Sequence, residues 1–162
     1  MAPVPRLIAC ALAMGTVSAA AQSPVPTTLT PALRAHVRDE RLQAVTSVLG
    51  MPVGVRAEMQ RLFGGPTLDI AEPGARFQVT DVIQYPLQPV RRLNLAGCSM
   101  DHCLVYYERG GIAHSWYVVL FHWTPAETRV DAGGLAPMGL QSVDDVRKAL
   151  LSGALKDALG RW

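Results

Sequence analysis

The chain has 162 residues and a formal charge of +2 at pH 7, with 15 Lys and Arg residues against 13 Asp and Glu residues. A charge balance this close to neutral argues against nucleic acid as a partner and against strong steering toward acidic partners. The apolar run from Leu7 to Val17 is too short to cross a bilayer. We therefore expect no transmembrane segment in the mature chain.

The apolar run near the N-terminus predicts a signal peptide over residues 1–21. Arg6 supplies a positive charge before the run, and Ala19-Ala20-Ala21 fits the small residues that precede a cleavage site. Cleavage after Ala21 would leave 141 residues, beginning at Gln22, and would send the protein to the periplasm or out of the cell. A lipoprotein acylated at Cys10 is the alternative, but no hydrophobic region precedes that cysteine.

The remaining residues predict one α+β domain over residues 30–162, after a flexible leader over residues 22–29. Helices are indicated by an N-cap threonine before proline, by apolar positions on one face, and by a serine followed by acids. The predicted helices are 31–49, 53–63 and 143–152. Stretches rich in β-branched and aromatic residues predict an antiparallel β-meander of about four strands. The predicted strands are 91–97, 103–108, 113–123 and 128–132.

The two central strands are predicted to form a tight hairpin. Gly110-Gly111 suits a two-residue type I′ turn, which would place Glu108 opposite Ala113 and Tyr107 opposite His114. This register assigns one face of the sheet to Leu93, Leu95, Leu104, Tyr106, Tyr117, Val119 and Phe121. It assigns the other face to Val105, Tyr107, His114, Trp116, Val118 and Leu120. Because both faces are apolar, we expect helices or a partner chain to cover both.

Cys98 and Cys103 are predicted to form a disulfide across the preceding hairpin. Their strands place them opposite each other, and an exported chain meets oxidising conditions. A loop this short contributes only about 2 kcal/mol in the chain-entropy model. The same loop holds Met100 and His102, which with reduced thiols would suit Cu(I), or together with Asp101 would suit zinc, so a metal-binding loop is the alternative. Otherwise His102 is expected in solvent at the loop tip.

Two further groups of residues are candidates for function. His114 is the candidate general base of a catalytic site, with Tyr107 facing it, and the alternative is a half-buried histidine with a structural role. Glu108 and Arg109 at the hairpin tip, together with Trp116, are candidate contacts for a binding partner, because Arg and Trp often anchor interfaces. The alternative for the tip is an ordinary solvated turn.

These observations favour an exported domain that acts by binding an unidentified protein or an envelope partner, without a cofactor, over an enzyme. Two short N-terminal helices before an antiparallel meander resemble small outer-membrane assembly lipoproteins and secreted enzyme inhibitors, and this resemblance implies an envelope-associated or inhibitor-like role. Two alternatives remain. One is a periplasmic copper or zinc handling protein that uses the Cys98–Cys103 loop, and the other is a small hydrolase in which His114 acts with Tyr107 or Glu108.

Overall fold

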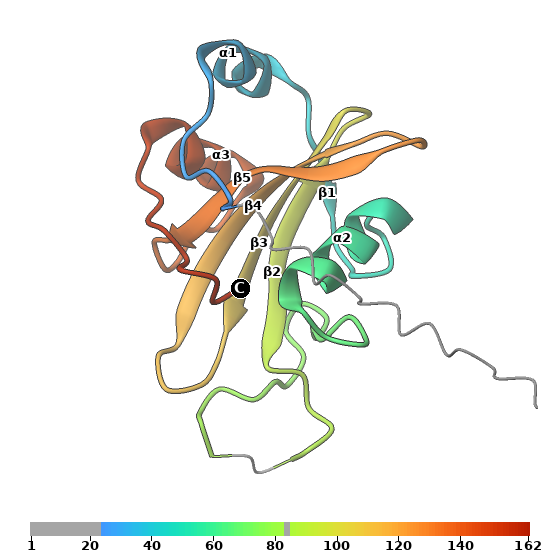
Figure 1. Cartoon of the computed structure of the whole chain (residues 1–162), viewed down its shortest axis with the longest axis vertical. Coiled ribbons are helices and arrows are strands. Elements are labelled where there is room, and N and C mark those ends of the chain that lie inside the picture. Colours follow the sequence, from blue (N-terminus) through green and yellow to red (C-terminus); the bar gives the residue numbers. More distant parts are fainter. Residues whose placement is uncertain (1–23, 83–84) are drawn as a thin grey trace, which may run out of the picture.

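The computed structural model describes residues 24–82 and 85–162, within which it forms one five-stranded antiparallel sheet and three helices (Figure 1). The elements are α1 (Pro31–Asp39), β1 (Gln43–Val45), α2 (Val53–Phe63), β2 (Arg91–Cys98), β3 (His102–Arg109), β4 (Ser115–Trp123), β5 (Thr128–Ala136) and α3 (Val143–Ser152). The strands lie in the order β1-β2-β3-β4-β5, which confirms the predicted α+β class and its β-meander. No helix within these residues is long and apolar enough to span a bilayer. The predicted signal peptide lies outside the described residues.

The first helix is shorter than predicted, and a strand follows it. The prediction of a helix over residues 31–49 is wrong beyond Asp39, because Glu40 adopts an extended backbone with ψ of 136°. Gln43–Val45 then pairs with the end of β2 as the edge strand β1. Pairing with β2 satisfies backbone groups along the sheet edge, and this tertiary contact overrides a weak local preference for helix.

β3 lies at the centre of the sheet and is buried on both faces, since every residue from His102 to Glu108 is buried. On one face, Val105 and Tyr107 belong to a core that includes α2 and Trp162. On the other face, Leu104 belongs to a core that includes α1 and α3 (Figure 1). Helices therefore cover both sides of the sheet, as the apolar pattern of its central strands predicts.

The predicted register of the β3–β4 hairpin is wrong. Five residues, 110–114, connect the strands, so that Glu108 faces Trp116 and Tyr107 faces Tyr117. Of Gly110 and Gly111, only Gly111 has a positive φ, of 116°. A type I′ turn requires a positive φ at both of its central residues. Gly110 instead allows a close backbone contact, since a Cβ there would clash with the carbonyl oxygen of Gln78.

The changed register also corrects the predicted division of side chains between the two faces. Odd-numbered residues of β3 now share a face with odd-numbered residues of β4, whereas the tight turn would have paired odd with even. In β2, a bulge makes Asn94 an extra residue, so that Leu93 and Leu95 lie on opposite faces instead of sharing one. A second bulge makes Asp131 the extra residue of β5. Bulges redirect side chains in this way.

The predicted disulfide is confirmed. Cys98 and Cys103 are direct partners in the β2–β3 register, with Cα atoms 4.0 Å apart, and their sulfurs are bonded. The bond closes the turn of residues 99–101.

Part of the predicted flexible leader is packed rather than free, since the carbonyl of Pro26 accepts a hydrogen bond from Gly133 N (2.8 Å) and Leu29 is buried.

A pair of tyrosine variants tests the packing of the two cores. Burial raises the pKa of Tyr107, whose hydroxyl has no hydrogen-bond partner among the described residues, while the Tyr106 hydroxyl donates to the carbonyl of Pro137 (3.0 Å). We expect Tyr107→Phe to raise the free energy of unfolding by up to about 1 kcal/mol and Tyr106→Phe to lower it by about 1 kcal/mol. Urea denaturation measures both, and an equal loss in the two variants would contradict this account.

Removing the disulfide tests its share of stability. The double variant Cys98→Ala/Cys103→Ala should lose about 2 kcal/mol of unfolding free energy, because only a short loop is closed. Its far-UV circular dichroism should remain that of the parent. Reduced wild-type protein is the control and should show a similar loss, whereas a variant that no longer folds would show that the bond organises the sheet.

Candidate metal centre

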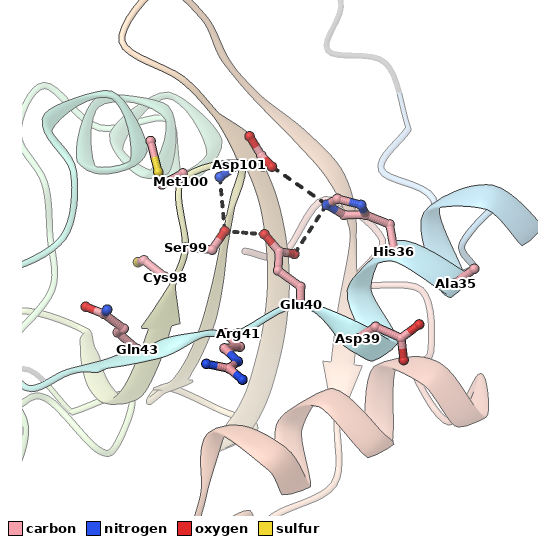
Figure 2. A pocket seen from close by; sticks show the side chains of 10 residues that line it. All are labelled: Ala35, His36, Asp39, Glu40, Arg41, Gln43, Cys98, Ser99, Met100 and Asp101. Carbon is pink, nitrogen blue, oxygen red and sulfur yellow. Dashed lines mark hydrogen bonds and ion pairs between the residues drawn. The ribbon is translucent and has the colours of Figure 1, made fainter.

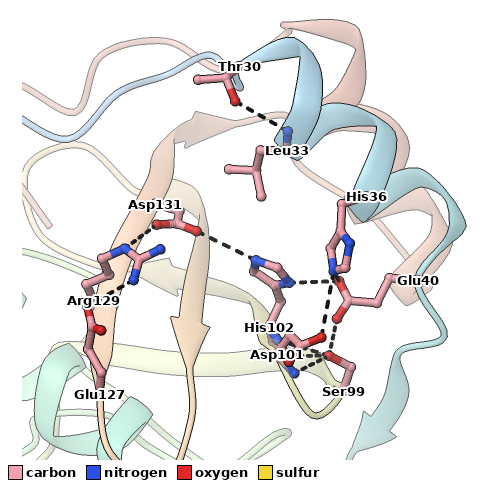
Figure 3. A network of polar contacts seen from close by, with 10 residues as sticks. All are labelled: Thr30, Leu33, His36, Glu40, Ser99, Asp101, His102, Glu127, Arg129 and Asp131. Carbon is pink, nitrogen blue, oxygen red and sulfur yellow. Dashed lines mark hydrogen bonds and ion pairs between the residues drawn. The ribbon is translucent and has the colours of Figure 1, made fainter.

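Three of the four histidines come together at one end of the sheet. His36 comes from α1, His102 begins β3, and His122 lies near the end of β4. The rings of His102 and His122 are direct cross-strand neighbours with centroids 5.5 Å apart. The ring of His36 lies beside that of His102 (Figure 3), and their centroids are 5.1 Å apart. The fold thus gathers imidazoles that are distant in the sequence.

His102 is the centre of this group and is 5% exposed, so the prediction of a solvated histidine at a loop tip is wrong. Its Nδ1 lies 3.0 Å from Oε2 of Glu40, and its Nε2 lies 3.6 Å from Oδ2 of Asp131. The ring is buried because it begins β3 and packs beneath α1 between these two carboxylates (Figure 3). Both nitrogens of one imidazole therefore face carboxylate oxygens.

Local structure sets the positions of His36 and Glu40. Thr30 caps the N-terminus of α1, accepting a hydrogen bond from Leu33 N, and Pro31 begins the helix. His36 lies in the last turn of α1, and Glu40 directly follows the helix as its C-cap, so both side chains lie at the end of α1 that faces His102. The Ser99 hydroxyl donates to the Glu40 carboxylate and helps to hold it toward His102.

Two donor groups share His102. The first is His36, Glu40 and His102, and the second is His102, His122 and Asp131; within each group the ligand atoms lie within 4.8 Å of one another. The first group is the better cation site, because Arg129 Nε already donates to Asp131 (3.0 Å) and offsets its charge. In metal sites a ligating histidine commonly directs its second nitrogen to a carboxylate. Asp131 suits this supporting role.

Asp101 supplies a fourth donor beside the first group. Its Oδ2 lies 3.9 Å from Nε2 of His36, and the Oε2 of Glu40 lies 3.9 Å from the same nitrogen. Figure 2 shows both carboxylates turned toward His36, at the wall of a cavity of about 800 Å³. The two imidazoles and one carboxylate of the first group suit a Zn²⁺ ion, and Asp101 lies next to them as a further carboxylate outside the 4.8 Å group.

Sequence reasoning identified His102 and Asp101 as possible zinc ligands and missed their partners His36, Glu40 and Asp131. Met100 is 85% exposed and points away from His36 and Glu40 in Figure 2, and the two cysteines form a disulfide. The spacing of His36 and Glu40 was the one available signal. The partnership with Asp131 depends on the β5 bulge, which no local pattern shows.

The other candidate residues lie at the opposite end of β3. Glu108 is 4% exposed; Arg92 Nε donates to one carboxylate oxygen (2.8 Å) and His114 Nε2 lies 2.7 Å from the other. His114 also stacks on Trp116, with centroids 4.3 Å apart. Tyr107 packs on the opposite face of the sheet, so the structure joins His114 to Glu108 instead.

The candidate binding residues are more enclosed than the connection beside them, in which residues 112–114 are exposed. Arg109 is half-buried, and its Nε is enclosed without a hydrogen-bond partner in the described part of the chain. Trp116 is half-buried as well and packs against the core that contains α3. Glu108, Arg109 and Trp116 thus pack at this end of the sheet, and their part in binding stays a prediction.

Comparisons with known proteins give no relative from which a role could be inferred. No protein-family model, no curated protein and no solved structure matches this chain. The interpretation of the centre therefore depends on the geometry of its own residues.

The Glu108 cluster yields a prediction about stability. Glu108→Gln places an amide NH₂ group against donors from Arg92 or His114, so we expect a loss of about 2 kcal/mol in the free energy of unfolding. Glu127→Gln is the matched control, because Glu127 pairs with Arg129 in solvent and should change stability by less than about 0.5 kcal/mol. Urea denaturation compares the two, and similar losses would show that the buried cluster is energetically unimportant.

Proposed function

We propose that this chain is an exported binding protein whose ligand is a divalent transition metal, with zinc the best match. The observation that carries the proposal is the buried imidazole of His102, which faces the carboxylates of Glu40 and Asp131 and lies beside His36 and His122. The export part rests on the predicted signal peptide and on the disulfide, which is typical of oxidising compartments.

The charges around the cavity support a cation as the ligand. Its charged lining residues, among those described, are Asp39, Glu40 and Asp101 against Arg41 alone. A concave surface with excess carboxylate attracts positive ions. A bound Zn²⁺ ion would balance the charges of Glu40 and Asp101, and a charge-neutral site avoids the cost of an unpaired buried charge.

The donor types favour zinc over Cu(I), which prefers soft sulfur ligands. The two thiols are bonded to each other in the disulfide and cannot bind the metal. The metal-handling hypothesis therefore keeps His102 of the Cys98–Cys103 loop and replaces the thiols by the donors of the His102 centre. The competing interpretation is a purely structural network, in which a charged His102 holds two carboxylates together without any ion. Direct metal titration separates these interpretations.

Titration of the purified, metal-free protein with zinc chloride tests the proposal. Isothermal titration calorimetry should show one ion per chain, because the two donor groups share His102. His36→Asn and His102→Asn should weaken binding by at least about 100-fold, and Asp131→Asn by about 10- to 100-fold as a supporting residue. His114→Asn is the matched control and should bind like the parent.

Two results would contradict the proposal. One is the absence of zinc binding by the parent protein under conditions where its circular dichroism shows a folded domain. The other is an equal effect of His36→Asn and His114→Asn, since only the first of these histidines belongs to the centre. His36 is largely exposed, so its replacement is a test that does not depend on the packing of β3.

A further inference from the structure

We infer that the metal is a clamp that holds α1 on the sheet, so that loss of the metal releases this helix. The inference rests on the proposed function and concerns the regulation of the same centre. It follows from where the donors come from in the chain, from how α1 is attached elsewhere, and from the carboxylates on both sides of the junction.

The four donors come in two pairs from two parts of the fold. His36 and Glu40 belong to the end of α1, whereas Asp101 and His102 belong to the β2–β3 turn and the first residue of β3. The Glu40–His102 contact joins residues 62 positions apart in the sequence. An ion bound by both pairs would link the helix to the hairpin directly.

The packing of α1 on the rest of the domain is light. Of its nine residues only Val37 is buried, and Leu33 is a partly buried neighbour in the same core. Arg34 donates to the carbonyl of Leu151 in α3, and Arg147 donates to the carbonyl of Glu40 (2.9 Å). Segments that bury few apolar side chains are the ones that open at low free-energy cost.

Carboxylates lie on both sides of the junction between α1 and the β2–β3 turn. Carboxylate oxygens of Glu40 and Asp101 both lie 3.9 Å from the same nitrogen of His36. These contacts are long and half-exposed at His36 and Asp101, so they hold α1 to the β2–β3 turn only weakly. A divalent ion bound by His36, Glu40 and His102 would add a direct link across this junction, so its binding favours closure.

Release of α1 would change the surface of the domain. Val37 and Leu33 share their core with Leu104 and Leu120 on the face of the sheet that α1 and α3 cover. Movement of α1 would uncover part of this apolar face while α3 stays in place.

Hydrogen exchange with mass spectrometry tests the clamp on the full chain, with and without zinc chloride. At a free zinc concentration of 100 times Kd, amides of residues 31–40 should exchange up to about 100-fold more slowly, because an ion that binds only the closed state stabilises it by that factor. Amides of α2, on the opposite face, are the internal control and should not change. His36→Asn should abolish the slowing, and His114→Asn should retain it.

The possible outcomes separate the clamp from the proposed function. If calorimetry shows zinc binding while exchange in residues 31–40 is unchanged, the clamp is overturned and the metal-binding proposal stands. If these amides already exchange as slowly as those of α2 without zinc, the clamp is likewise overturned. If zinc does not bind at all, the proposed function fails and the clamp fails with it. Slowing confined to residues 31–40 and the turn of residues 99–101 supports the clamp.

Discussion

The burial of β3 on both faces is the constraint on which the rest of the structure depends. A strand covered on both sides has no solvent-facing positions, so every side chain from His102 to Glu108 must be accommodated inside the domain. The apolar ones are accommodated by α2 and Trp162 on one face and by α1 and α3 on the other. The polar residues at its two ends require partners, because a buried polar group without one costs free energy.

The two ends of β3 meet that requirement in different ways. At one end, Glu108 is surrounded by Arg92 and His114, so its charge is already compensated within the chain. At the other end, His102 lies among carboxylates, including those of Glu40 and Asp131. At the Glu108 end, the carboxylate is therefore paired with basic side chains of the chain itself. At the His102 end, carboxylate acceptors instead lie beside the imidazoles. This difference is why the His102 end supports a cation site.

Local patterns predicted the elements that depend on few distant contacts. The alternation of β-branched and aromatic residues located the strands, and the spacing of Cys98 and Cys103 located the disulfide. The end of the first helix and the β3–β4 register were predicted wrongly, because each depends on a segment remote in the sequence. β1 forms because it pairs with β2 along the edge of the sheet. The backbone of Gly110 packs closely against Gln78, and this contact replaces the predicted tight turn.

The sequence by itself determined the class of fold, the approximate positions of strands β2 to β5 and the cysteine pairing, because these follow from periodicity and from chain geometry over a few residues. Only the tertiary structure decided which side chains share a face and which polar groups meet. A bulge at Asp131 and the packing of α1 on β3 bring Glu40, His102 and Asp131 together. Their side chains converge through the pairing of strands and the docking of a helix, and both are set by the burial of distant apolar residues rather than by any local motif.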